Sequence, residues 1–176
     1  MIKQENEAFV TFDNEEIGLI MDDSNHEKYP IRYYNVINGI GLESKEDCSY
    51  YGFVYEGNIQ LITPNRSDIN VDKSMYFSVA GRFVINPECE SKVVVIEVEH
   101  TKGVYPINNY RAMFSVGGGV EEEGRLKYID GCTDSLLIAP IKLGDPCLNH
   151  LHFPKEIEQT PHTHPSHRIG IVTKGN

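Results

Sequence analysis

The sequence lacks clusters of lysine and arginine, and it lacks long apolar runs. Its 26 acidic residues outnumber 16 basic ones, which gives a formal net charge of −10. Because an acidic surface repels a phosphate backbone, this balance argues against nucleic-acid binding. No apolar run has the length of a membrane span, and the polar start Met1–Glu7 has no apolar signal-peptide core. We therefore predict a cytoplasmic protein that binds neither nucleic acid nor membranes.

Closely spaced cysteines are also missing. The four cysteines, Cys48, Cys89, Cys132 and Cys147, are far apart in the sequence, and none forms a C-x-x-C pair. This spacing supports neither a zinc ribbon nor a dithiol redox motif. With no export signal, we expect four free thiols in a reducing compartment.

A helical hydrophobic period is absent as well. Instead, short β-branched or aromatic runs recur every eight to twelve residues, with turn signals such as Asn38–Gly39 between them. This pattern predicts an all-β sandwich or barrel. We expect a polar loop at Thr63–Asp72, and Gly57–Asn58 is expected to turn the chain back on itself. The expected strands are Ala8–Phe12, Ile17–Met21, Ile31–Ile37, Tyr50–Glu56, Ile59–Ile62, Met75–Val79, Arg82–Ile85, Lys92–Val98, Arg111–Val116, Leu126–Ile129, Ser135–Ile141, Cys147–Phe153 and Arg168–Thr173.

One stretch has the composition of a linker. Gly117–Gly119 is followed by three glutamates and Gly124, and such glycine-rich polar runs typically join domains. We therefore predict a β domain over residues 1–116, a linker over 117–124 and a second unit over 125–176. The chain also repeats itself weakly: Tyr50–Asn58 aligns with Arg168–Asn176 at two glycines, a valine and an asparagine. This match suggests two copies of one β unit.

Three histidines lie close together near the C-terminus. His162, His164 and His167 fall within six positions, just before the β-branched run Ile169–Val172. Alternate residues of a strand project from the same face, so His162 and His164 are expected to point the same way. Neutral imidazole nitrogens bind divalent metals, which makes this stretch a candidate metal site. The alternative is a surface loop with incidental histidines.

The spacing of these residues resembles the first motif of the cupin family, in which a glycine precedes His-x-His, then a glutamate, then a second glycine. His162, His164 and Gly175 are in register with that motif. Two positions depart from it: Glu156 stands where the first glycine belongs, and Arg168 stands where the glutamate ligand belongs. The resemblance implies an all-β fold, a cupin-type jelly-roll β-barrel or sandwich.

The upstream half resembles a degenerate copy of the same family. Val79–Val84 is similar to the second cupin motif, with Val84 in place of its histidine. The resemblance therefore implies two units, of which the first has lost its metal ligands and the second is incomplete. An incomplete unit leaves strand edges unpaired, so we expect a homo-oligomer or a strand-exchanged dimer.

The resemblance also implies a function. It suggests a divalent metal ion, Zn, Fe, Mn or Ni, held by His162, His164 and His167. It further suggests a small-molecule substrate contacted by Arg168, His150 and His152, although Arg168 can equally form a salt bridge at the rim. The implied activity is that of a metal-dependent cupin acting on a small organic molecule, as a dioxygenase, isomerase, lyase or cyclase. The alternative is a non-catalytic cupin that binds a small molecule or has a regulatory role.

Overall fold

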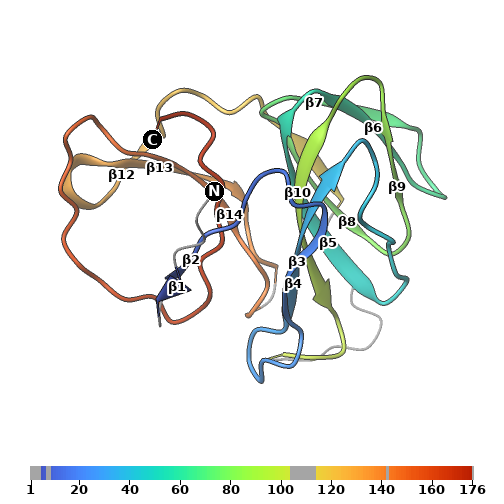
Figure 1. The fold of residues 1–176 in the computed structure, drawn as a ribbon, viewed down its shortest axis with the longest axis horizontal. Coiled ribbons are helices and arrows are strands. Elements are labelled where there is room, and N and C mark those ends of the chain that lie inside the picture. The colour runs from blue at the N-terminus through green and yellow to red at the C-terminus, as the bar shows by residue number, and fades with distance from the viewer. Residues whose placement is uncertain (1–4, 7–8, 104–113, 142, 176) are drawn as a thin grey trace.

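The computed structural model describes residues 5–6, 9–103, 114–141 and 143–175, and these residues are mostly β (Figure 1). All strand pairings among them are antiparallel, and the only helical element they contain is a 3-10 turn at Ile129–Gly131. Within this part of the chain no helix is long and apolar enough to cross a membrane. The strands are β1 (Glu5–Asn6), β2 (Phe9–Val10), β3 (Gly18–Asp23), β4 (Ile31–Ile37), β5 (Cys48–Glu56), β6 (Asn58–Ile62), β7 (Ile69–Asp72), β8 (Tyr76–Ala80), β9 (Val84–Pro87), β10 (Lys92–Glu99), β11 (Ser115–Gly117), β12 (Leu126–Lys127), β13 (Thr133–Ile138) and β14 (Leu148–His152).

A six-stranded sheet forms the middle of the molecule, in the order β11-β8-β5-β10-β4-β3. Three-stranded sheets of order β7-β6-β9 and β12-β13-β14 lie to either side of it, and β1 pairs with β2 alone (Figure 1). The described strands form open sheets and no closed barrel. The all-β prediction is therefore confirmed, and the jelly-roll assignment stays a prediction.

The larger core lies between the six-stranded sheet and the sheet of β6, β7 and β9. Strand β10 shows why: it reads K-V-V-V-I-E-V-E, and its side chains alternate between the two faces of the sheet. Val93 and Val95 are fully buried in the larger core, where they pack with Ile59, Leu61 and Val71 of the small sheet. Burying these side chains contributes roughly 1.5–3 kcal/mol each.

The other face of the six-stranded sheet carries a second, smaller core. Ile96 and Val98 of β10 belong to it, together with Ile138 of β13 and Leu148 of β14. Ile169, from the C-terminal segment, packs against the same cluster. The C-terminal hairpin is thus held to the main sheet by apolar contacts, and the molecule has three β layers.

One charged side chain is buried on the face of the six-stranded sheet that carries the larger core. Glu97 has the same orientation as Val93 and Val95, and its side chain is 0% exposed. Arg32 donates to Glu97 Oε1 at 2.8 Å, Lys45 donates to the same oxygen at 2.7 Å, and the Tyr50 hydroxyl donates to Oε2 at 3.1 Å. A buried carboxylate is tolerated when it is paired and hydrogen-bonded in this way.

Strand β3 pairs with β4 through an irregular ladder. Leu19 lies opposite Tyr34, but Met21 lies opposite Tyr33, so Ile20 is an extra residue without a partner in β4. Such a bulge changes which side chains of a strand face a given layer. The strand ends at Asp23, directly before the loop that carries His26.

Several sequence-based expectations were wrong. The stretch expected as a loop, Thr63–Asp72, contains β7, and Gly57 does not form a hairpin, because β6 leaves the main sheet and pairs with β7 and β9. Arg168–Thr173 is not a strand; it follows the surface without a ladder. The proposed repeat of Tyr50–Asn58 is not seen in the structure, because that segment contains a central strand and its counterpart contains none.

The predicted boundary at residues 117–124 remains a prediction. Strand β11 ends at Gly117 and belongs to the main sheet, whereas β12, β13 and β14 form a sheet of their own. Residues 111–113 of the predicted strand Arg111–Val116 lie outside the described residues, as does Ala8 of the predicted strand Ala8–Phe12.

Candidate metal centre

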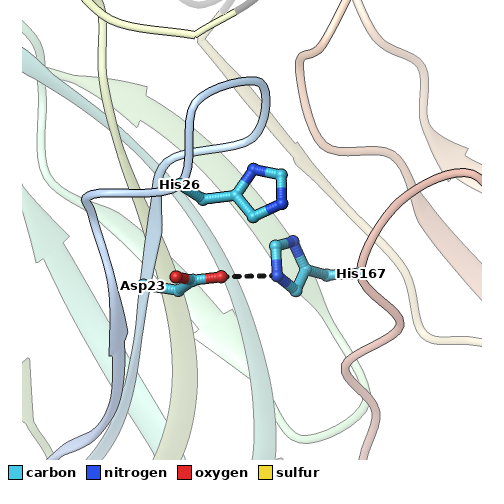
Figure 2. Close-up of side chains that lie close together, drawn as sticks. All are labelled: Asp23, His26 and His167. Carbon is cyan, nitrogen blue, oxygen red and sulfur yellow. Dashed lines mark ion pairs between the residues drawn. The ribbon is translucent and has the colours of Figure 1, made fainter. Parts of the chain in front are cut away.

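Three side chains from two distant parts of the sequence meet at the rim of the central sheet. Asp23 ends β3, His26 follows in the β3–β4 loop, and His167 comes from the C-terminal segment (Figure 2). Each offers one ligand atom, and these atoms all lie within 4.8 Å of one another. Two imidazoles and one carboxylate form a donor set that could hold a metal ion.

A tight turn at the end of β3 positions Asp23. The Ser24 N–H donates to Asp22 Oδ1 at 2.9 Å, and hydrogen bonds from Ser24 lower the pKa of Asp22 to about 2. On the other side, Arg32 donates to Asp22 Oδ2 at 3.1 Å. Asp22 is therefore engaged within its own loop and strand pair, which leaves the Asp23 carboxylate to face the histidines.

Backbone hydrogen bonds fix the ring of His26. Its Nδ1 accepts from the N–H of Lys28 at 3.2 Å and from that of Tyr29 at 3.0 Å. In the neutral ring the proton is then on Nε2. Figure 2 shows one His26 nitrogen on the side that faces His167, and the two ring centroids are 4.8 Å apart in an edge-on arrangement.

His167 has one engaged nitrogen and one without a partner. Its Nε2 lies 2.6 Å from Asp23 Oδ2, with side-chain exposures of 28% and 38% respectively. Its Nδ1 is buried and has no hydrogen-bond partner among the described residues. A buried polar atom without a partner is rare and calls for an explanation. A cation beside Nδ1 supplies one, since a carboxylate that holds the other nitrogen is a common companion of metal-binding histidines.

The structure brings only one of the predicted metal ligands into this group. His162 and His164 are exposed and lie outside any strand, so their predicted projection from a strand face is wrong. Their rings are nevertheless neighbours, with centroids 4.7 Å apart. Arg168 donates to His164 Nδ1 at 2.7 Å, and desolvation, Arg168 and His162 together lower the pKa of His164.

The other predicted site residues lie on β14. His150 lines a cavity of about 350 Å³ together with Tyr76, Ser135 and Arg125, and its buried Nδ1 has no hydrogen-bond partner among the described residues. His152 lies opposite Thr133 in the hairpin. Their role in substrate binding, like that of Arg168, stays a prediction.

Sequence reasoning missed Asp23 and His26. They belong to the stretch Asp22–Pro30, which has the composition of an ordinary polar loop. An Asp-x-x-His spacing directly after a strand was the only local signal. The partner residue His167 follows some 140 positions later, and nothing in a single sequence shows that these two segments touch.

No protein-family model matches the sequence, and the comparison with curated proteins found no match. Fold and site together define a class only: a mostly β protein with antiparallel sheets and a His–His–Asp group that could hold a metal ion. The cupin resemblance therefore rests on the motif residues alone.

Proposed function

We propose that this chain is a metal-dependent protein of the cupin type that acts on a small organic molecule, with a divalent cation bound by the imidazoles of His26 and His167 and with Asp23 orienting His167. The observation that carries the proposal is the convergence of one carboxylate and two imidazoles within 4.8 Å. Imidazoles are common ligands of zinc and of non-haem iron, and a carboxylate often holds the other nitrogen of a ligating imidazole. The facing sheets of the main core support a jelly-roll arrangement.

The residues present fit a cation, with one condition. The partnerless Nδ1 of His167 has a lone pair directed away from Asp23, because the opposite nitrogen, Nε2, contacts that carboxylate. His26, in contrast, offers a lone pair at Nε2 only if the proton moves to Nδ1, which then no longer accepts from Lys28 and Tyr29. Binding is therefore expected to release or relocate protons and to disturb those two amides.

With the ion at Nδ1 of His167, the two imidazoles would be its direct protein ligands and the other coordination positions would stay free, and an open position is what catalytic sites keep. A bound divalent ion would supply Lewis acidity toward a coordinated oxygen or, if it is iron, a site for oxygen chemistry. Asp23 would hold the imidazole of His167 in a fixed orientation. Fold and donor set do not choose between dioxygenase, isomerase, lyase and cyclase chemistry.

Metal titration of purified protein tests the site. We expect about one equivalent of Zn²⁺ or Mn²⁺ to bind the wild-type chain in calorimetry, with shifts of the Lys28 and Tyr29 amide resonances in NMR. His26→Ala and His167→Ala are each expected to weaken binding by about 100-fold or more, and Asp23→Asn, which alters the partner of a ligand, by about 10- to 100-fold. His162→Ala is the matched control and should bind as the wild type does.

Two results would overturn the proposed ligand set. One is the absence of stoichiometric binding by the wild-type chain. The other is binding that survives His26→Ala but is lost in His162→Ala and His164→Ala, which would return the site to the pair expected from the sequence. Circular dichroism of each variant checks that the β fold is intact.

The second candidate function is a non-catalytic regulatory or binding role for the same cation. A specific observation favours it: neither the cavity beside His150 nor a cavity of about 410 Å³ at one end of the larger core is lined by Asp23, His26 or His167. In this arrangement the ion would fix the C-terminal segment to the β3–β4 loop. Structural metal sites have closed coordination, whereas catalytic sites keep an open position.

Cobalt substitution separates the two candidates. With Co²⁺ bound, we expect the visible absorption bands to change when azide is added, because an open position accepts the anion. A spectrum insensitive to azide at saturating concentration would contradict the catalytic proposal and support the regulatory one. His162→Ala again serves as the control that should respond as the wild type does.

A further inference from the structure

A separate cavity opens at one end of the larger core. Its volume is about 410 Å³, and it lies between the end of β4, the loop that follows β4, the end of β6 and the start of β9. Val36, Leu42, Phe83 and Ile85 give it an apolar wall. Cavities of roughly 300–1,000 Å³ with mostly apolar walls are typical of small-molecule sites. None of its lining residues belongs to the metal centre.

The mouth of this cavity carries a cation without a partner. Arg82 lines the cavity and is exposed, and within the described part of the chain it makes no hydrogen bond and no ion pair. By contrast, Arg32 and Arg125 are both paired with carboxylates. A free guanidinium beside an apolar hollow is suited to a carboxylate, which it can bind through two parallel hydrogen bonds.

A second polar group in the same wall lacks a partner. The Thr63 hydroxyl is buried and makes no hydrogen bond to any of the residues that the structure describes. Ser44, which also lines the cavity, differs: its hydroxyl donates to the Phe83 carbonyl and accepts from the Phe83 N–H. A buried hydroxyl without a partner is unfavourable, and a polar ligand atom in this cavity would give Thr63 one.

We propose that this cavity binds a small monocarboxylate with an apolar body. The body would occupy the hollow between Leu42 and Ile85, and the carboxylate would meet Arg82 at the mouth. Glu43 is the one carboxylate in the lining, and its charge opposes an anion. Two opposite effects on carboxylate binding are therefore expected. Loss of the Arg82 charge weakens binding of the carboxylate, and loss of the Glu43 charge strengthens it.

Calorimetry and NMR titration with octanoate test the inference, with octanol and octylamine as neutral and cationic analogues. We expect octanoate to bind more tightly than either analogue and to shift resonances of Leu42 and Ile85. Arg82→Gln should weaken octanoate binding about 10- to 100-fold, the loss of a charge-assisted hydrogen bond. Arg82→Lys should lose less, and Glu43→Gln should bind octanoate more tightly than the wild type.

Lys127→Gln is the matched control. It removes one positive charge from an exposed position on β12 and should leave octanoate binding unchanged. Tighter binding of octylamine than of octanoate would overturn the inference. So would an unchanged affinity in Arg82→Gln, or the absence of binding by all three probes. The titration is done on chelator-treated protein and repeated with His26→Ala, so a failure here leaves the metal proposal standing, and the reverse also holds.

Discussion

Glu97→Ala is expected to lower the free energy of unfolding by about 3 kcal/mol. Removing one partner of a buried ion pair costs about 3–5 kcal/mol, because the remaining charge loses its partner inside the protein. The lower end applies here, since the Lys45 side chain is 50% exposed and can extend into water. Arg32 is only 21% exposed and keeps a single acidic partner, Asp22. Urea denaturation followed by circular dichroism measures the loss.

Two further variants define that result. Glu97→Gln keeps the shape and one acceptor oxygen, so a smaller loss than with alanine is expected. Glu122→Ala removes an exposed carboxylate that pairs with Lys174 and should leave the denaturation midpoint unchanged, as is usual for surface pairs. A loss below about 1 kcal/mol for Glu97→Ala would show that the network around Glu97 contributes little to stability.

Gly52→Ala is expected to cost about 2–3 kcal/mol, which is large for a single added methyl group. Gly52 lies in the middle of β5, where the fully buried ring of Phe77 on β8 covers it. A Cβ built at Gly52 overlaps with that ring, so the ring or the strand has to move. Thermal and urea denaturation of the variant give the size of the effect.

Gly170→Ala is the matched control for this substitution. No atom lies within 4 Å of a Cβ at Gly170, so the same methyl group should be tolerated there. Trimming the ring with Phe77→Leu should reduce the cost of Gly52→Ala, because the two side chains share one space. An equal cost in both backgrounds would mean that the overlap is relieved without strain. Gly52 and Gly170 are also the glycines that coincide when Tyr50–Asn58 is aligned with Arg168–Asn176, so the two variants compare the two segments of the suggested repeat directly.

The central strands could be predicted because each carries its own signal. Strand β4 has the predicted bounds, Ile31–Ile37, since a β-branched and aromatic run lies between Pro30 and a turn. That turn, Asn38–Gly39, has positive φ at both residues, as a two-residue hairpin turn with Asn-Gly requires. Local chemistry and final structure agree here, so sequence alone is sufficient.

Strands that depend on their neighbours were not predictable. Strand β7 has only two apolar residues in I-N-V-D, and its formation depends on pairing with β6. Conversely, Ile169–Val172 is apolar and β-branched, yet it forms no strand because no neighbouring strand pairs with it. Ile169 packs on the second core while Val172 is 75% exposed. Residues with high strand propensity are those whose side chains pack well on a pleated sheet. They form a strand only where a neighbouring strand is available to pair with them.

The candidate site was predictable in part for the same reason. His167 belongs to a conspicuous group of histidines, and it is the one that meets the β3–β4 loop. His162 and His164 carry the motif resemblance, yet they face solvent. The position of the C-terminal segment on the main sheet decides which of its imidazoles joins Asp23 and His26. That position depends on apolar contacts such as those of Ile169.

The unpaired Ile20 in β3 decides which acidic residue faces the histidines. Side chains alternate along a strand, so each added residue reverses the assignment of all later positions to the two sides. With Ile20 present, Asp23 is opposite Ile31, whose side chain belongs to the core that also receives Ile169. If the same sequence paired without the bulge, Ile20 would lie opposite Tyr33, Asp22 would lie opposite Ile31, and Asp23 would turn toward the other layer. The bulge in this six-residue strand thus selects between two adjacent aspartates.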